Sequence, residues 1–145
     1  MKAVLQRVTR AQVEVEGQVV GAIEQGFCVF VGVAGDDTSA NAEKMAQKIA
    51  AMRIFSDENG KFNLSLADVK GSILLVSNFT LFGETRKGNR PFFGSAALPE
   101  LAEELYERLA TLLRAQGIPT QTGVFGAAMK VQLENDGPVT LILEF

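Results

Sequence analysis

Alternation of apolar and polar residues with a period of two constrains the fold of this 145-residue chain more than any other feature. The pattern occupies residues 11–15 and 19–23, and it returns at 129–133 and 139–145. Such alternation is typical of half-buried strands. The run from Phe27 to Val33 is apolar throughout, which predicts a central strand that is covered on both faces.

Two other segments carry apolar residues at helical spacing. The first spans residues 42–52, where the N-cap could be any of four residues, Asp36 to Ser39. The second begins at Pro99 and ends at Gly117. Together these patterns predict a mixed α/β fold: a curled, barrel-like, mostly antiparallel sheet with two long helices packed outside. The length suits a single domain spanning residues 1–145.

The chain contains no histidine and one cysteine, which excludes several catalytic arrangements. Ser-His-Asp and Cys-His sites are impossible, and no set of residues suits a catalytic zinc ion. Cys28 cannot form an intrachain disulfide, and its apolar neighbours predict a buried, inert thiol. No phosphate-binding loop of the P-loop type is present. We therefore expect neither a metal nor a cofactor.

The net charge of −3 argues against charge-driven binding along a nucleic-acid duplex, although a contact limited to a terminus is permitted. No apolar run reaches the roughly 20 residues of a membrane span. Charged residues interrupt the N-terminus too early for a signal peptide. These features predict a cytoplasmic protein that binds neither membranes nor DNA. The one basic cluster, Arg86–Arg90, is typical of a solvated loop.

Two segments are candidate functional sites. In Ser77–Leu81, strand alternation puts Asn78 and Thr80 on the face opposite Phe79, which marks either a pocket rim or a simple strand exit. Thr80 is a candidate nucleophile, but no nearby residue can act as its base. In Asn135–Pro138 we expect a sharp reversal between two strands. This reversal is either an ordinary turn or a rigid surface of main-chain carbonyls.

These two segments resemble the motifs of the D-aminoacyl-tRNA deacylase family. The family's Ser-Gln-Phe-Thr-Leu motif corresponds to Ser77–Leu81, and its Asn-x-Gly-Pro-Val-Thr motif is intact at Asn135–Thr140. The resemblance extends from Met1 to Phe145 and includes four further matching stretches: Gln6–Val8, Arg53–Phe55, Thr85–Gly88 and Gly123–Ala127.

The resemblance implies a homodimeric hydrolase that cleaves the ester between a D-amino acid and the 3′-terminal adenosine of tRNA. In the family the Gly-Pro bond is cis and reaches into the partner's pocket. Carried over, the carbonyls of Gly137 and Pro138 would hold the α-amino group of the substrate. An L-side chain would collide with this wall, whereas glycine would be accepted. The resemblance also implies that Arg7 steadies the partner's Gly-Pro loop, with a plain surface arginine as the alternative.

For the chemistry, the resemblance leaves two routes. Thr80 could attack the ester, or the 2′-hydroxyl of the terminal ribose could assist while the protein stabilises the oxyanion. Because no base adjoins Thr80, we favour the second route, with main-chain N–H groups around Phe79 and Thr80 as donors. Ser77 and Asn78 complete this catalytic segment. Three further residues match positions of the family's adenosine pocket, and each also suits a core: Ala102, Phe125 and Met129.

The chain departs from the family pattern at two positions on the rim of the expected pocket. Asn78 replaces a glutamine, so its amide is shorter by one methylene and its hydrogen bond is either lost or bridged by water. Ala128 stands where an acidic or polar residue is common. The alternative function is a non-catalytic dimeric module for an RNA end or a nucleotide, which Arg86–Arg90 beside an apolar pocket suggests.

Overall fold

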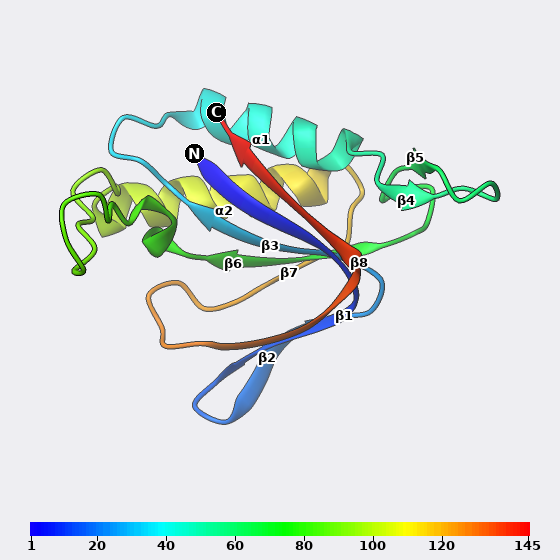
Figure 1. Ribbon diagram of the computed structural model, residues 1–145, viewed down its shortest axis with the longest axis horizontal. Coiled ribbons are helices and arrows are strands. Elements are labelled where there is room, and N and C mark those ends of the chain that lie inside the picture. Colours follow the sequence, from blue (N-terminus) through cyan, green and yellow to red (C-terminus); the bar gives the residue numbers. More distant parts are fainter.

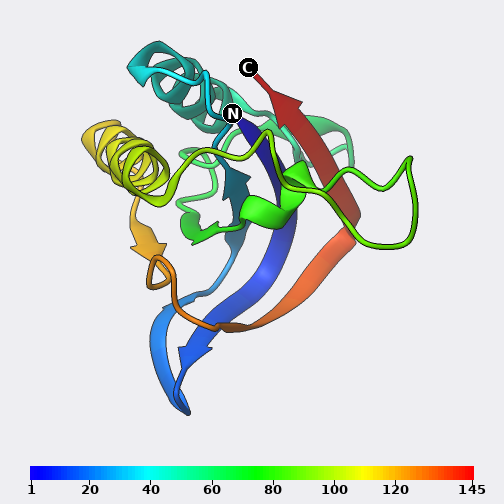
Figure 2. The same ribbon diagram turned by 90° about the vertical axis from the view of Figure 1, so that its left-hand side faces the viewer.

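The computed structural model describes residues 1–145 as one curled sheet, a small two-stranded sheet and two helices (Figure 1). The elements follow one another as β1 (Lys2–Val15), β2 (Gln18–Ile23), β3 (Gly26–Gly32), α1 (Ser39–Ala51), β4 (Phe55–Ser56), β5 (Phe62–Leu64), β6 (Ser72–Ser77), the 3-10 helix η1 (Phe79–Phe82), α2 (Pro99–Ala115), β7 (Thr120–Thr122) and β8 (Lys130–Glu144). The predicted mixed fold with a nearly closed, barrel-like sheet is confirmed (Figure 2). Neither helix combines the length and the apolar character that crossing a membrane would demand.

The long strand β1 organises the sheet because both of its edges are paired. β8 runs antiparallel along one edge, while the other edge pairs with β3 near its start and with β2 near its end. β3 pairs with β6 and β6 with β7, both in parallel. The ends of β3 and β6 therefore lie side by side, where the polypeptide leaves the sheet.

The apolar run predicted as a central strand is confirmed as β3, between β1 and β6. Phe27, Val29 and Val31 belong to the larger core beneath the helices, whereas Cys28 belongs to a smaller core on the opposite face. Alternate residues thus enter two cores, which explains the absence of polar residues. Burial raises the pKa of the Cys28 thiol to about 12, as expected for an unreactive cysteine.

Both predicted helices are confirmed. α1 follows Thr38, whose N–H donates to Oδ1 of Asn41 at 2.9 Å, so the open capping register is resolved. α2 begins at Pro99, and Gly117 follows its end with a φ of +78°. The buried faces of the two helices share the larger core with the sheet. The helices therefore cover one face of the sheet (Figure 2).

A bulge in β2 overturns part of the predicted alternation. Val13 pairs with Gly21 but Glu14 pairs with Val19, so Val20 is an extra residue in β2. An extra residue exchanges the two faces of the strand beyond it. Val19 is consequently 53% exposed, whereas Gly21 is buried as predicted.

The predicted reversal at Asn135–Pro138 is wrong, because β8 continues through this segment along β1. Gln6 pairs with Thr140 and Val8 with Asn135, so two steps on β1 match five on β8. The three additional residues form a bulge in a strand that keeps its direction. Turn-forming composition favours a reversal here, but pairing with β1 on both sides of the bulge overrides that local preference.

Candidate active site

A pocket of about 460 Å³ opens where β3 and β6 end. The start of α2, η1 and the loop before β8 supply its other walls, and these segments gather at the end of the molecule that faces the viewer in Figure 2. Six residues singled out from the sequence line it: Ser77, Asn78, Phe79, Ala102, Phe125 and Met129. The fold thus brings into one pocket side chains that are up to 52 residues apart in the sequence.

The strand pattern was expected to continue through Ser77–Leu81, but β6 stops at Ser77 and η1 follows. The N–H of Asn78 makes a last sheet-like bond to the Val31 carbonyl at 2.7 Å. Its side-chain Oδ1 then accepts a hydrogen bond from the Thr80 N–H at 3.1 Å and caps η1. The chain leaves the strand because the asparagine side chain offers the backbone a competing local partner.

Thr80 lies beside the pocket but does not line it. Its hydroxyl donates to Oδ1 of Asn78 at 2.5 Å, and an amide oxygen cannot serve as a general base. The shortened amide at position 78 therefore keeps direct hydrogen bonds. It also occupies the Thr80 N–H, which corrects the expectation that this group is free to bind an oxyanion. The Phe79 N–H makes no hydrogen bond in the structure and is the donor that remains available.

Tyr106 is a pocket residue that the sequence pattern did not identify, because it lies in the apolar stripe of α2 and resembles a core residue. Its hydroxyl donates to the Leu75 carbonyl at 2.8 Å, and its ring lies 5.9 Å from that of Phe125. Burial raises the pKa of Tyr106 to about 12, so the phenol is neutral. No other ionisable side chain lines the pocket, which therefore offers no acid or base of its own near neutral pH.

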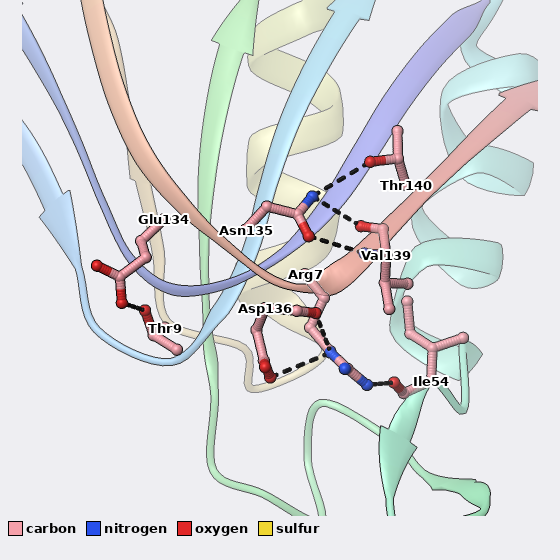
Figure 3. A network of polar contacts seen from close by, with 8 residues as sticks. All are labelled: Arg7, Thr9, Ile54, Glu134, Asn135, Asp136, Val139 and Thr140. Carbon is pink, nitrogen blue, oxygen red and sulfur yellow. Dashed lines mark hydrogen bonds and ion pairs between the residues drawn. The ribbon is translucent and has the colours of Figure 1, made fainter.

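Arg7 is only 7% exposed, so the interpretation as a plain surface arginine is wrong. Its Nε donates to the Asp136 carbonyl at 3.0 Å and pairs with Asp136 Oδ2 at 3.2 Å, while Nη1 donates to the Ile54 carbonyl at 2.5 Å (Figure 3). The guanidinium thus connects the bulge of β8 to the residue before β4. These bonds lie within one chain, so Arg7 holds the Gly-Pro segment of its own chain. The resemblance had implied a contact between Arg7 and the Gly-Pro loop of a partner subunit.

The Gly137-Pro138 peptide is cis, and the bulge around it is closed by Asn135. Asn135 Oδ1 accepts from the Val139 N–H at 2.7 Å, and its Nδ2 donates to the Val139 carbonyl at 3.1 Å (Figure 3). Gly137 has a φ of +141°, and a Cβ there would lie 2.7 Å from Cγ2 of Val139. Only glycine fits this position. Arg7 and Asn135 therefore hold the Gly-Pro step from two sides, while Gly137 and Pro138 themselves are exposed.

The pocket and the Gly-Pro segment do not meet within one chain. Arg7, Gly137 and Pro138 are absent from the pocket wall, and their network adjoins β4. The β4–β5 hairpin and η1 lie at opposite ends of the molecule (Figure 1). Ala128 is exposed next to the pocket residues Ala127 and Met129 but is not part of the wall. No three His, Cys, Asp or Glu side chains gather closely enough to hold a metal ion.

Comparisons with known proteins agree over nearly the whole chain. A family model described as D-Tyr-tRNA(Tyr) deacylase matches residues 4–144. A D-aminoacyl-tRNA deacylase from Koribacter versatilis is 56% identical over 144 residues, which are 99% of this chain and 97% of that relative. The D-aminoacyl-tRNA deacylase from Fervidobacterium nodosum is 51% identical with the same coverage.

Two solved structures have the same fold. One, described as a c-Myc DNA unwinding element binding protein, superposes with a TM-score of 0.94 at 45% identity and covers 100% of this chain and 99% of that chain. Another, described as a probable eukaryotic D-amino acid tRNA deacylase, has a TM-score of 0.84 at 19% identity, with 98% and 97% covered. At that identity the likeness concerns the fold alone. From the family model and its curated relatives, the chain belongs to the D-aminoacyl-tRNA deacylase family, hydrolases that cleave the ester bond of aminoacyl-tRNA.

Proposed function

We propose that this cytoplasmic, single-domain protein hydrolyses the ester between a D-amino acid and the 3′-terminal adenosine of tRNA, and also clears glycine from mischarged tRNA. The observation that carries the proposal is the exposed Gly137-Pro138 segment, held by Arg7 and Asn135 in a chain of the deacylase family. Its main-chain carbonyls can accept hydrogen bonds from the α-amino group of the substrate, and these bonds do not depend on which side chain the substrate carries.

Chirality is selected by exclusion in this proposal. When the α-amino group binds the carbonyls of Gly137 and Pro138, the position of the α-carbon is defined. The side chain of an L-residue then points into the rigid segment, whereas that of a D-residue points away. Glycine has no side chain and escapes the same exclusion. Selection against one hand in this way accounts for broad tolerance within the other.

The active site is completed by a second copy of the chain. Within one chain the Gly-Pro segment adjoins β4, and the pocket lies at the opposite end of the sheet. The Gly-Pro segment and the pocket are both accessible to solvent. The segment lines no cavity, and the pocket wall lacks the Gly-Pro carbonyls that would bind the α-amino group. A homodimer in which each copy inserts its segment into the partner's pocket resolves this separation.

The chemistry proceeds without a titrating side chain. The 2′-hydroxyl of the terminal ribose assists the attack of water on the ester carbonyl, and the Phe79 N–H stabilises the developing oxyanion. The absence of an acid or base from the pocket wall and the bond from Thr80 to Asn78 support this route over a threonine nucleophile. Ala102, Phe125 and Met129 surround the adenosine, and Ser77 and Asn78 shape the pocket beside the ester.

Paired hydrolysis assays test the proposal. Wild-type protein should release tyrosine from D-tyrosyl-tRNA while L-tyrosyl-tRNA survives, and glycyl-tRNA carrying a mismatched tRNA body should also be cleaved. Equal rates on the D- and L-substrates would overturn it.

A non-catalytic module that binds an RNA end is the alternative, and the DNA-related name of one structural neighbour adds DNA as a ligand to examine. Filter binding of tRNA and of DNA, run beside ester hydrolysis, separates these functions. Binding of either without turnover would support the alternative. The net charge of −3 favours a contact confined to a nucleic-acid terminus over binding along a duplex.

A further inference from the structure

The loop between η1 and α2 is an anchored arm beside the pocket. Two hydrogen bonds close its base, from the Glu84 N–H to the Phe92 carbonyl at 2.8 Å and from the Phe92 N–H to the Glu84 carbonyl at 3.0 Å. The ring of Phe93 then packs edge-on against that of Phe79, a pocket residue, with centroids 5.1 Å apart. In Figure 2 this loop, drawn in green to yellow-green, projects sideways from η1 at the pocket end of the molecule.

The tip of this arm carries two cations that no carboxylate neutralises. Arg86 is engaged, because its Nε donates to Glu84 Oε2 at 2.6 Å and its backbone N–H donates to Oε1 at 2.8 Å. Lys87 and Arg90 are exposed and take part in no ion pair. The tip is therefore locally positive on a chain of net charge −3, and the base of the arm contacts the pocket through the Phe93–Phe79 ring pair.

Phe92 adds an exposed aromatic surface to the base of the arm. Its side chain is 70% exposed, although a phenyl ring normally favours burial. The ring is supported from one side by Gly94, where a Cβ would lie 2.3 Å from the Phe92 Cζ atom. A ring that rests on backbone and faces solvent, next to unpaired cations, is the combination that binds single-stranded nucleic acid by stacking and phosphate contacts.

We propose that Phe92, Lys87 and Arg90 form a binding site for the unpaired 3′ end of tRNA, outside the pocket that takes its terminal adenosine. Phe92 stacks on a base upstream of that adenosine, and the two cations contact phosphates of the same strand. This inference rests on the proposed function, because the terminal adenosine must occupy the pocket for its upstream neighbours to reach the arm.

The stacking contact is tested by comparing two ester substrates, D-tyrosyl-tRNA and D-tyrosyl-adenosine, which lacks every upstream nucleotide. Loss of one stacked base typically reduces affinity by about fivefold or more. Phe92→Ala should therefore lower kcat/KM for D-tyrosyl-tRNA at least about fivefold more than for D-tyrosyl-adenosine. Phe92→Tyr, which keeps the aromatic face, should restore the wild-type ratio, while Phe92→Leu should not. A similar loss on both substrates would overturn the stacking contact.

The phosphate contacts are tested by the double variant Lys87→Ala/Arg90→Ala. Two lost contacts to a single strand should reduce the slope of log KM for D-tyrosyl-tRNA against log salt by about 1.4. The matched control is Lys44→Ala/Lys48→Ala, which removes two exposed lysines of α1 and the same net charge. This control should keep the wild-type slope. Equal slopes for both double variants would overturn the phosphate contacts.

The measurements on wild-type protein separate this inference from the proposed function. If wild-type protein fails to hydrolyse D-tyrosyl-tRNA, the proposed function fails first. If it hydrolyses that substrate and the arm variants keep both the substrate ratio and the salt slope, only the inference about the arm fails. Thermal unfolding of every variant establishes that the comparison is made on folded protein.

Discussion

Arg7 and Asn135 show how single side chains in this protein hold backbone in place. Arg7 donates to the main-chain carbonyls of Asp136 and Ile54, and Asn135 bonds both main-chain polar groups of Val139. Neither side chain lines the pocket. In the pocket, Asn78 does the same for η1. Recognition by backbone needs such supports, because a carbonyl can define the position of a ligand only if its own position is defined.

Arg7→Lys keeps the positive charge but loses the fork that reaches Asp136 and Ile54 together. Because buried carbonyls lose a donor, we expect the free energy of unfolding to fall by about 1–3 kcal/mol. The looser Gly-Pro segment should also raise the rate on L-tyrosyl-tRNA relative to D-tyrosyl-tRNA. Urea unfolding and paired hydrolysis assays measure the two effects.

Arg10→Lys is the matched control for that change, because Arg10 lies on the same strand but forms an exposed ion pair with Glu134. Its replacement should cost no more than about 1 kcal/mol and leave chiral selection unchanged. If the two variants behave alike, Arg7 does not support the Gly-Pro segment in chiral selection.

Thr80→Ala should retain most of the wild-type kcat. The Thr80 hydroxyl donates to an amide oxygen and has no base to activate it. A tRNA that ends in 2′-deoxyadenosine should instead lose hydrolysis, because the proposed route needs the 2′-hydroxyl. A fall in kcat by several orders of magnitude for Thr80→Ala, with normal turnover of the deoxy substrate, would contradict this assignment. Single-turnover hydrolysis measures both.

At the scale of elements, the bulge in β8 is the device that presents the Gly-Pro step. Ordinary pairing with β1 would bury these residues in the ladder, whereas three additional residues push them outward. Asn135 closes the base of the bulge through both its amide oxygen and its amide nitrogen. The proposed selector is therefore part of a long strand, which gives it more rigidity than a free loop would have.

Asn135→Asp should weaken the closure of this bulge. The aspartate keeps an oxygen for the Val139 N–H but cannot donate to the Val139 carbonyl, which loses its side-chain donor. We expect faster hydrogen exchange at residues 136–139 than in wild type, with exchange in β3 unchanged. Mass-spectrometric or NMR exchange measures this difference. Unaltered protection across the bulge would show that Asn135 does not close it.

The elements with strong periodicity were predictable from the sequence, whereas the two candidate functional segments were predictable only in part. The run that forms β3 and the stripes of α1 and α2 are long enough for burial to dictate their conformation. The conformations predicted for the two candidate segments were wrong, because the strand predicted to continue through Ser77–Leu81 ends at Ser77 and the reversal predicted at Asn135–Pro138 is a bulge. In both, an asparagine side chain or a distant strand decides the path of the backbone, and neither influence is visible in local periodicity.

The burial of Arg7 could not be predicted from local periodicity either. An arginine in an alternating strand gives no sign that it is buried, because its partners are carbonyls at positions 54 and 136. Tyr106 was hidden in an apolar stripe for a similar reason, since its phenol bonds to a backbone carbonyl of β6. Contacts from side chains to distant main chain leave no residue-type signature in the sequence.

At the scale of the whole molecule, the curled sheet keeps the pocket and the Gly-Pro segment at opposite ends of one chain (Figure 1). In the proposed dimer, each monomer would contribute two half-sites, and the symmetric pair would hold two complete sites. Activity should accordingly depend on association, and the selector would remain idle in an isolated subunit.

The stability of the folded molecule should fall in alkali. Burial raises the pKa values of Cys28 and Tyr106 to about 12, above the values of about 8.5 and 10 in an unfolded chain. The unfolded chain therefore binds fewer protons from about pH 9 to pH 12, and stability is lost as pH rises through this window. Below about pH 8 these two groups add no pH dependence. Urea midpoints at pH 7.5, 9 and 10.5 measure the trend.

Cys28→Ala supplies the control for the pH series. This variant should lose the part of the fall in stability that begins near pH 9. It should keep the part at higher pH, which comes from Tyr106. A midpoint for the wild-type protein that stays constant or rises between pH 9 and 10.5 would contradict the burial of both groups.

The most direct test of the central claim is a crystal structure of the protein with a non-hydrolysable D-tyrosyl-adenosine analogue. The account predicts a dimer in which the analogue's adenine occupies the pocket and its α-amino group lies about 3 Å from the carbonyl oxygen of Gly137 of the partner subunit. A bound analogue whose amino group meets only groups of its own subunit, with both Gly-Pro segments left in solvent, would contradict it.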